Sequence, residues 1–472
     1  MVFSSLIFLI IFLPILLILY YLMPSKKTFL FKNIILLIFS LIFYAWGEPI
    51  YVLIMLFSSV VDYTIGIFIE KLPNKKKLWV IFSIIINLGM LIVFKYTNFF
   101  ISNINNIFNV DISLLELALP IGISFFTFQT MSYSIDVYRG NVKAEKNFLN
   151  FFLYVSMFPQ LIAGPIVRYK DISKELKKRT ITFQSVSEGF KIFLFGLFKK
   201  VLIANNLGLL FDTIKIMNSN ELSFILSWIG IIVFSLQIYF DFSGYSNMAL
   251  GLGKMLGFTY PENFNYPYIS KSIKEFWTRW HITLSSFFKD YVYIPLGGSR
   301  CSLSRNIINL LIVWMLTGFW HGAEWNYLLW GLYFGVILIF EKYVLKNILD
   351  KLPNILKHLY AIIFILIGWL IFTSNDIVYL SDYLKSLLFI DVSFINNTSI
   401  ELLLSNTFIL IIACLLSTPI YKVLSNKIER LNNKYIKFII NILIIICMII
   451  LFIITLSYLV SNSYNPFLYF RF

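Results

Sequence analysis

Charged side chains are scarce in this chain: Asp, Glu, Lys and Arg make up only 13% of its 472 residues, whereas apolar residues make up 59%. Ordinary soluble domains are about 25% charged and about 45–50% apolar. A water-soluble fold cannot bury so large an apolar fraction, and intrinsic disorder is excluded because it requires low hydrophobicity. Polar stretches long enough to form a soluble domain are also missing. We therefore expect residues 1–472 to form a single domain that is integral to a lipid bilayer.

Cysteine is nearly absent as well. The three cysteines, Cys301, Cys414 and Cys447, show neither a metal-binding spacing nor the pattern of a disulfide framework. We expect no metal, and no bound cofactor either. The 39 Lys and Arg residues exceed the 24 Asp and Glu residues, which gives a net charge of +15. In a soluble protein this excess would suggest nucleic acid, but short cytoplasmic loops of membrane proteins collect Lys and Arg. We expect membrane lipid as the partner and no nucleic acid.

Apolar runs alternate with short loops along most of the chain. Since one crossing takes about 20 residues, we expect about ten or eleven transmembrane or re-entrant helices. The runs cover residues 2–23, 29–46, 51–69, 78–94, 121–137, 222–240, 307–319, 325–340, 359–372, 408–416 and 438–459. Basic residues gather in alternate loops, including residues 71–77 and 422–437. This asymmetry predicts that those loops face the cytoplasm and that both chain ends face outside.

The middle of the chain is less regular. Residues 151–163 are apolar but few and have basic residues on both sides, which predicts a re-entrant segment. Residues 190–210 carry Lys199 and Lys200 at their centre, so we expect this segment to lie partly along the membrane interface, with both ammonium groups reaching the head groups. Residues 241–300, the least apolar stretch, are predicted to be mostly cytoplasmic, and residues 375–406 to form an outer loop.

Histidine is as rare as cysteine, and His321 is the most informative of the three. It lies between two apolar runs, where an ionisable side chain is costly and is by default a functional candidate. Gly318 and Gly322 on one side, and Gly331 and Gly335 on the other, have the spacing of four that permits helix backbones to approach closely. The simpler alternative, a histidine that caps a helix end at the outer surface, is the less favoured interpretation.

His281 follows Trp277 and Trp280, and at helical spacing these residues share one apolar face with Leu284. This pattern suits a buried neutral base and a satisfied core histidine equally well. Two histidines from separate segments can form one site, as a proton acceptor and a partner that orients or polarises it. The spacing alone does not prove that His281 and His321 meet.

Other chemistries find little support. The chain has no Gly-x-Ser-x-Gly motif, no His-Glu-x-x-His motif and no phosphate-binding glycine loop. His358 precedes an apolar run and is predicted to lie at head-group level. Asp62, Asp136 and Asp241 lie near the ends of runs, where they are compatible with proton coupling in a transporter. We favour the simpler interpretation that each aspartate pairs with a neighbouring polar group.

A series of ordered motifs resembles the membrane-bound O-acyltransferase (MBOAT) superfamily, and within it the bacterial branch of alginate O-acetyltransferase-like proteins. The most specific motifs are FWTRWH at 276–281, YIPLGG at 293–298 and WHG at 320–322. Further motifs extend the resemblance over most of the chain: MVFSS at 1–5, FYAWG at 43–47, GISFFTFQ at 122–129, IDVYRG at 135–140, FPQLIAGPI at 158–166 and NPFLYFRF at 465–472.

The resemblance implies an all-α polytopic membrane enzyme whose helices surround a central tunnel. Its catalytic histidine matches His321, and a second family position, which holds Asn, Asp or His depending on the branch, matches His281. It further implies that an acetyl group moves from cytosolic acetyl-CoA, the acyl donor, toward a hydroxyl acceptor outside. A base in a dry tunnel suits this reaction, because it activates the hydroxyl while exclusion of water protects the donor from hydrolysis.

The same resemblance implies partners and a location. A serine-hydrolase-like O-acetyltransferase outside the cytoplasm would place the acetyl group on a polysaccharide, either an exopolysaccharide such as alginate or a cell-wall polymer. The enzyme would be a multi-pass protein of the bacterial inner (plasma) membrane. The nearest alternative is the sister branch, which moves D-alanine from a carrier protein to teichoic acid. An alternative of another class is a transporter of glycan precursors, although charges at the midplane are sparse. The sequence leaves the polymer and the donor-binding residues open.

Overall fold

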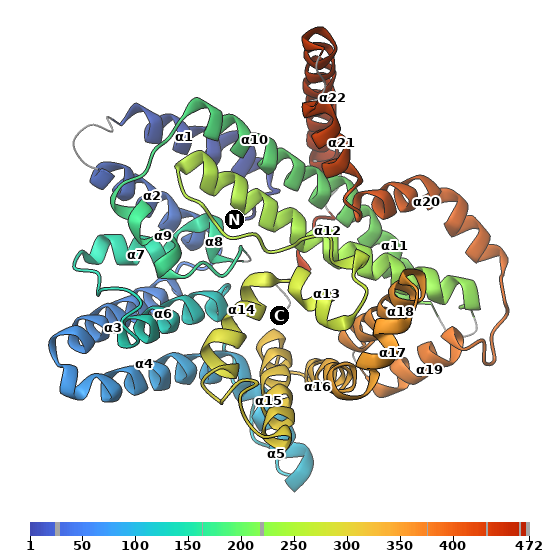
Figure 1. The fold of residues 1–472 in the computed structure, drawn as a ribbon, viewed down its shortest axis with the longest axis horizontal. Coiled ribbons are helices and arrows are strands. Elements are labelled where there is room, and N and C mark those ends of the chain that lie inside the picture. Colours follow the sequence, from blue (N-terminus) through green and yellow to red (C-terminus); the bar gives the residue numbers. More distant parts are fainter. Residues whose placement is uncertain are drawn as a thin grey trace. The chain divides into compact units, whose positions relative to one another are not determined.

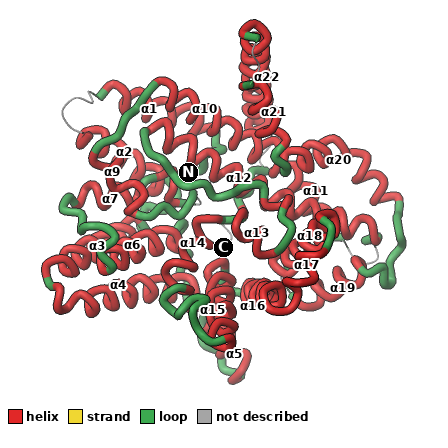
Figure 2. Tube along the Cα trace, in the orientation of Figure 1, coloured by secondary structure: helices red, strands yellow, loops and turns green. Residues whose placement is uncertain are grey.

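The computed structural model describes residues 1–23, 29–162, 164–217, 221–374, 376–430, 433–461 and 464–468. Within these ranges every regular element is a helix (Figure 2), apart from one parallel bridge between Ser223 and Ser393. The all-α fold expected from the sequence is therefore confirmed. Residue 163 of the predicted re-entrant segment, residue 375 of the predicted outer loop and residues 469–472 of the last motif lie outside the described residues.

Apolar helices of membrane-spanning length recur along the described part of the chain. Nine are long and apolar enough to cross a membrane: Val52–Lys71, Pro73–Phe108, Phe183–Lys215, Phe224–Leu256, Leu303–His321, Trp325–Lys351, Asn354–Thr373, Asn397–Leu416 and Lys434–Ser461. Two shorter apolar helices, Ile7–Leu22 and Phe29–Ala45, precede them. Nine and two make eleven, a total within the range expected, and the chain is a multi-pass membrane protein. The members differ at two places: Phe183–Lys215 is a candidate span where a partly interfacial segment was expected, and the helix Ile123–Tyr138, which covers the expected run 121–137, is not one of the eleven. The central tunnel stays a prediction.

The chain divides into two compact units. The first contains Met1–Phe193 and Tyr245–Glu262, and the second contains Leu194–Gly244 and Asn263–Phe472. Two long helices, α10 (Phe183–Phe198) and α12 (Phe224–Leu256), contribute residues to both units. Whether the two units make a single domain, as the composition suggests, stays a prediction.

The first unit is a set of short and medium helices: α1 (Leu13–Leu22), α2 (Phe29–Ala45), α3 (Val52–Lys71), α4 (Lys76–Leu91), α5 (Thr97–Phe108), α6 (Ile123–Tyr138), α7 (Phe148–Ser156), α8 (Phe158–Leu161) and α9 (Tyr169–Lys177). Helices α3, α4 and α6 pack on one another (Figure 1). Asp62 is fully buried among them and accepts hydrogen bonds from Ser83 (2.5 Å), Ser134 (2.6 Å) and Asn87 (2.7 Å). Pairing with neighbouring polar groups is thus confirmed for this aspartate.

The predicted re-entrant segment forms α7 and α8, two short buried helices separated at Met157. Neither is long enough to cross a bilayer, which agrees with the expectation that this segment does not span.

The second unit contains the remaining helices: α11 (Asn205–Lys215), α13 (Ile273–Arg279), α14 (Ile282–Phe288), α15 (Leu303–His321), α16 (Trp325–Phe340), α17 (Lys346–Lys351), α18 (Asn354–Thr373), α19 (Ile377–Leu387), α20 (Asn397–Leu416), α21 (Ile420–Glu429) and α22 (Lys434–Ser461). Helices α15 and α16 pack closely on each other. A Cβ atom added at Gly318 would lie closer than 3.0 Å to the carbonyl oxygen of Tyr327, and one at Gly331 equally close to that of Trp314. The close backbone approach predicted from these glycines is confirmed.

The prediction that Lys199 and Lys200 reach the lipid head groups is wrong. Both side chains are buried, in a π-helical turn that continues α10 directly into α11. Lys200 Nζ forms an ion pair with Asp241 Oδ1 at 2.6 Å and donates to Asn205 Oδ1 at 2.9 Å. An opposite charge and a neutral acceptor offset the cost of burial, so the ammonium group has no need to reach water.

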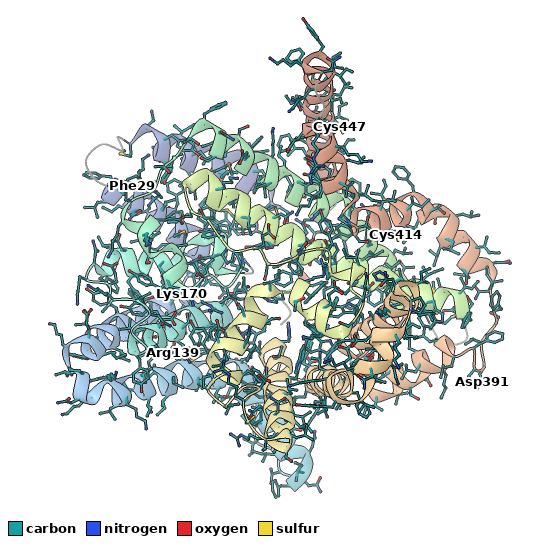
Figure 3. All side chains as sticks on the ribbon, viewed as in Figure 1. Phe29, Arg139, Lys170, Asp391, Cys414 and Cys447 are labelled. Atoms are coloured by element: carbon teal, nitrogen blue, oxygen red, sulfur yellow. The ribbon has the colours of Figure 1, made fainter. Side chains whose placement is uncertain are left out.

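The prediction that residues 375–406 form a loop is also wrong, because this segment contains α19 and the first turns of α20. Each helix begins at a side-chain cap: Asp376 accepts from the backbone N–H of Tyr379, and Asn396 accepts from that of Ser399. Such caps satisfy N–H groups that the first helical turn leaves unpaired. Downstream, α22 carries Cys447, and most of its side chains are exposed (Figure 3). Only 6% of the most apolar stretch of this helix is buried inside the protein, as expected of a helix surrounded by lipid.

Candidate active site

His281 lies at a sharp turn between two short helices of the second unit. Helix α13 ends at Arg279 and α14 begins at Ile282, and His281 between them has φ +43° and ψ +53°. This left-handed conformation is uncommon outside glycine. Two backbone hydrogen bonds hold it: the N–H of Asn265 donates to Arg279 O (2.9 Å), and the N–H of Ile282 donates to Asn263 O (3.0 Å). The helical face expected to join Trp277 to Leu284 is therefore interrupted at this histidine.

Asn263 fixes which ring nitrogen of His281 carries the proton. Its Oδ1 accepts from the backbone N–H of Thr283 (3.2 Å) and from the Thr283 hydroxyl (2.9 Å). A backbone N–H can only donate, so this atom is the amide oxygen. His281 Nδ1 lies 3.1 Å from the same oxygen and therefore donates to it. In the neutral ring Nε2 is then the acceptor nitrogen, the form required of a proton acceptor.

His321 is the last residue of α15 and is 5% exposed. The rings of Trp330 and Phe372 stand nearly perpendicular to its imidazole, with centroids at 5.0 Å and 5.5 Å. The close contact of α15 with α16 places Trp330 at this position. The imidazole is thus buried and packed against aromatic rings.

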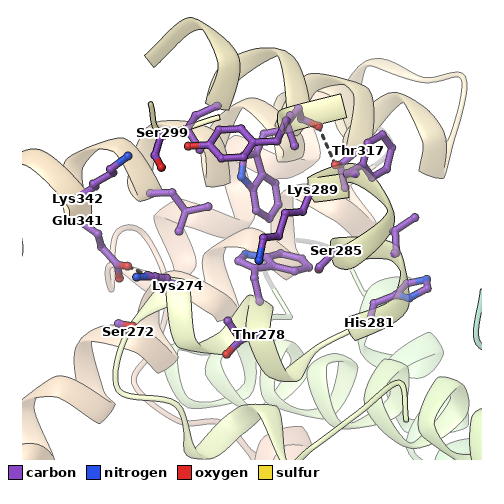
Figure 4. Close-up of a pocket in the computed structure, with 18 of the residues that line it drawn as sticks. Ser272, Lys274, Thr278, His281, Ser285, Lys289, Ser299, Thr317, Glu341 and Lys342 are labelled. Atoms are coloured by element: carbon purple, nitrogen blue, oxygen red, sulfur yellow. Dashed lines mark hydrogen bonds between the residues drawn. The ribbon is translucent and has the colours of Figure 1, made fainter. Parts of the chain in front are cut away.

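The two histidines line one cavity of about 960 Å³ within the second unit (Figure 4). The sequence pattern could not decide whether they meet, and the structure brings them to the same space. Its basic lining residues are Lys274, Lys289, Lys342 and Lys346. Figure 4 shows Lys289 reaching toward the middle of the cavity, with His281 at its edge. The arrangement offers two imidazoles and several ammonium groups to a single ligand.

Glu341 is one of the acidic side chains in the lining, and its carboxylate is engaged by the main chain. Oε1 accepts from the N–H of Ile273 (2.6 Å) and Oε2 from the N–H of Lys274 (2.9 Å). A carboxylate at the first turn of a helix also complements the helix dipole. Glu341 thereby fastens the first turn of α13 to the end of α16, and the cavity keeps an excess of positive charge.

The loop that carries the YIPLGG motif is held by asparagines of α15. Asn306 Nδ2 donates to Gly298 O (2.6 Å), while its Oδ1 accepts from Lys342 Nζ (2.6 Å) and from the Tyr343 hydroxyl (2.7 Å). Sequence reasoning missed Asn306 and Asn263. Asn263 is 18 residues from His281 in the chain, and no helical or strand period links residues that far apart.

The remaining candidates lie outside this cavity. His358 is on α18, where its Nδ1 lies 3.1 Å from Ser270 O. Asp241 pairs with Lys200, and Asp136 Oδ1 accepts from Asn141 Nδ2 at 3.0 Å, so the interpretation that these aspartates pair with polar neighbours is confirmed. Among the described residues, no group of three or more His, Cys, Asp or Glu side chains is placed to hold a metal ion.

Of the lysines within residues 241–300, Lys274 and Lys289 line the cavity. Lys254 belongs to the first unit, where it forms an ion pair with Glu188.

Titration of His281 should be visible in the stability of the protein. Burial lowers the pKa of this histidine well below its ordinary value of 6.5, and a positive charge on His321 lowers it further. Below pH 6.5 the unfolded chain therefore binds a proton that the folded protein does not, and stability falls as the pH falls. We expect the thermal unfolding midpoint to drop between pH 6.5 and about pH 5, at a cost of up to about 1.4 kcal/mol per pH unit. In His281→Gln the drop should be smaller, and an equal drop would contradict the assignment.

Comparison with known proteins identifies the family. The model of the membrane-bound O-acyltransferase family, MBOAT, matches residues 143–381, a range that includes both histidines of the cavity. The chain belongs to this family. It is accordingly a multi-pass membrane O-acyltransferase, which confirms the enzyme class and the all-α membrane fold expected from the resemblance.

Sequence comparison with individual relatives shows which branches of the family this chain resembles most. The chain is 41% identical over 384 residues to the probable alginate O-acetylase AlgI of Pseudomonas aeruginosa, covering 80% of this chain and 73% of that protein. It is 36% identical over 410 residues to the peptidoglycan O-acetyltransferase of Helicobacter pylori, covering 80% of this chain and 78% of that protein. It is 32% identical over 241 residues to the teichoic acid D-alanyltransferase of Bacillus subtilis, an alignment that covers 47% of this chain and 60% of that protein. The chain is thus similar over more of its length to the O-acetylating relatives than to the D-alanylating one.

Proposed function

We propose that this protein transfers an acetyl group from cytosolic acetyl-CoA to a hydroxyl acceptor, for the O-acetylation of a polysaccharide or cell-wall polymer outside the cytoplasm. The observation that carries the proposal is the cavity in which His281 and His321 lie together with four lysines. The names of the alginate and peptidoglycan relatives favour acetyl over other acyl groups.

In the proposed reaction His321 is the general base. It accepts the proton of the acceptor hydroxyl as the oxygen attacks the thioester carbonyl; the new C–O bond forms, the C–S bond breaks, and the proton passes to the departing CoA thiolate. His281, held by Asn263 with its acceptor nitrogen at Nε2, assists by orienting or polarising the reacting groups. The aromatic surroundings of His321 limit the access of water, which would otherwise hydrolyse the donor.

The lysines of the cavity suit the phosphate groups of CoA. Lys274 and Lys289 come from α13 and the end of α14, whereas Lys342 and Lys346 follow α16. Ammonium groups pair well with phosphate, and the engagement of Glu341 by the main chain reduces competition from a carboxylate. The basic loops of this region are on the side that the charge asymmetry predicts to be cytoplasmic.

The later steps of the proposal rest on the resemblance. A serine-hydrolase-like O-acetyltransferase outside the cytoplasm would receive the acetyl group and place it on the polymer, and the enzyme would lie in the inner (plasma) membrane of a bacterium. The relatives named for alginate and for peptidoglycan make an exopolysaccharide and a cell-wall polymer the two acceptor classes to be tested.

Donor use distinguishes the proposal from its alternatives. Purified protein given acetyl-CoA and acceptor should release free CoA, measured with a thiol reagent, because C–S cleavage accompanies transfer. Lys289→Gln should raise the KM for acetyl-CoA while changing kcat less, since the lysine binds phosphate and takes no part in the chemistry. Lys77→Gln, an exposed lysine of the first unit, is the control. Dependence on a D-alanyl carrier protein would instead assign the D-alanyl branch, and transport of a glycan without CoA release would assign a transporter.

A further inference from the structure

The first unit contains a cavity of its own, of about 500 Å³. Its walls are Tyr21 of α1, Phe29 and Lys32 of α2, and residues 179–182 between α9 and α10. Two of these side chains, Lys32 and Arg179, are cationic, and each is only 5% exposed. A cavity lined by two buried cations is unusual, because Lys and Arg are almost never fully buried without a partner.

Arg179 is held rigidly by neutral acceptors. Its Nε donates to the Tyr20 hydroxyl (2.9 Å) and to Leu256 O (3.1 Å), and its Nη1 donates to Asn33 Oδ1 (2.8 Å) and to Glu175 O (3.1 Å). The third guanidinium nitrogen, Nη2, is buried and has no hydrogen-bond partner among the described residues. A buried donor in that state costs free energy unless a ligand accepts from it.

Lys32 contributes a second positive charge, for which the described part of the chain supplies no counter-ion. Its Nζ lies 4.9 Å from the centroid of the Tyr20 ring, and no described residue forms a hydrogen bond or ion pair with it. The nearby carboxylate of Glu175 accepts from the backbone N–H of Thr259 at 2.9 Å and forms no ion pair with either cation within the described ranges.

Aromatic rings stabilise Arg179 only in part. The guanidinium carbon lies 4.4 Å from the ring centroid of Phe258 and 5.0 Å from that of Phe29. Stacking on ring faces offsets some of the desolvation of a cation, but it supplies no acceptor in the plane of the N–H groups. Among the residues that the structure describes, the two cations therefore still lack a charged acceptor. A compact anion with several oxygen atoms, shared by both cations, would supply it.

We propose that this cavity binds a phosphate group, with the Arg179 guanidinium and Lys32 Nζ as its positively charged groups. Phosphate offers several acceptor oxygens and pairs with guanidinium and ammonium groups through short, charge-assisted hydrogen bonds. Thr180 and Thr182 also line this space, and a threonine hydroxyl is a neutral donor. The site lies apart from the histidine cavity in the sequence and plays no part in the acyl transfer proposed above.

The phosphate can belong to the head group of an anionic phospholipid or to free phosphate. The surroundings suit the lipid, because Leu22 at the end of α1 and Phe31 at the start of α2 are 72% and 58% exposed and can contact acyl chains. The charge asymmetry of the loops also predicts that these helix ends face the cytoplasmic leaflet, where basic groups attract anionic lipids.

Binding to purified, delipidated full-length protein in a neutral detergent tests the proposal, with phosphatidylglycerol and inorganic phosphate as separate probes and native mass spectrometry as the readout. We expect phosphatidylglycerol to bind saturably at one site, and Lys32→Gln to weaken it at least about fivefold, the loss of one Lys–phosphate contact. Lys32 makes no hydrogen bond that folding would lose, so this variant should fold. Lys32→Arg should retain binding, and the exposed Lys77→Gln should bind as the wild type does.

The two probes separate the sources of the phosphate. If phosphatidylglycerol binds and millimolar phosphate does not displace it, the ligand is the lipid; if inorganic phosphate binds and displaces it, the ligand is free phosphate. Either result supports the proposal when Lys32→Gln weakens it. Equal binding of each probe to the wild type and to Lys32→Gln would overturn the proposal, as would dioleoylglycerol, which lacks phosphate, binding as tightly as phosphatidylglycerol.

Discussion

Replacement of His321 by alanine should reduce acyl transfer by about 10²–10⁴-fold, the usual contribution of a general base. The imidazole lies at the end of α15 in an aromatic environment, and it lines the same cavity as His281. An alanine leaves room for water, but a water molecule among these rings is a much weaker base than imidazole at neutral pH. The measurement is O-acetylation of the polymer in cells, together with CoA release by the purified variant, both normalised to the amount of folded protein.

Two further histidine variants serve as comparisons. His281→Ala should lower activity less severely than His321→Ala, because a water molecule can replace part of an orienting contact. Asn263→Ala should resemble His281→Ala, since it removes the acceptor that fixes the His281 tautomer. His358→Ala is the matched control: it removes the third histidine, which lies outside the cavity, and should be close to neutral. Normal acetylation by His321→Ala at normal protein levels would rule out the mechanism.

The candidate site shows what a single sequence can predict. His321 could be selected as a candidate because an ionisable residue between two apolar runs is costly, and the resemblance points to the same position. The structure places it in the cavity, and its role stays a prediction. The sequence indicated His281 as a candidate residue but did not predict its backbone conformation. The helical period placed it on a face with Trp277, whereas the chain leaves the helix at Arg279 and His281 adopts a left-handed φ. Backbone hydrogen bonds from the segment around Asn263 impose this turn, and they depend on tertiary structure.

The same limit explains the error at Lys199 and Lys200. A hydrophobic run with two lysines at its centre fits an interfacial helix as well as a buried one, and only the location of a counter-charge decides between them. That charge is Asp241, 41 residues after Lys200 in the chain. Charge patterns report the sidedness of loops well because that depends on local composition. They do not report which buried charges pair, because pairing depends on how distant helices pack.

The glycines between α15 and α16 should be among the least replaceable residues of the second unit. Gly318→Ala would place a methyl group closer than 3.0 Å to the carbonyl oxygen of Tyr327, and Gly331→Ala would do the same at that of Trp314. Both neighbours are backbone atoms, which cannot rotate away, so the helices must separate. We expect each variant to lose about 1–3 kcal/mol or more, the usual cost of overpacking a close contact. A fall in the unfolding temperature and in the yield of folded protein measures this loss.

Gly89→Ala is the control for this prediction, because the same substitution there is not expected to lower the stability of the protein. Gly89 lies in helix α4 of the first unit, and a Cβ atom there would meet nothing within 4 Å. Alanine is favoured over glycine in a helix by about 1 kcal/mol, so Gly89→Ala should be neutral or slightly stabilising. The same substitution should therefore act in opposite directions at Gly89 and at Gly318. Since α15 also carries His321, the Gly318 variant that does fold should lose activity beyond its loss of stability. Equal stability of Gly318→Ala and Gly89→Ala would contradict the close contact of α15 with α16.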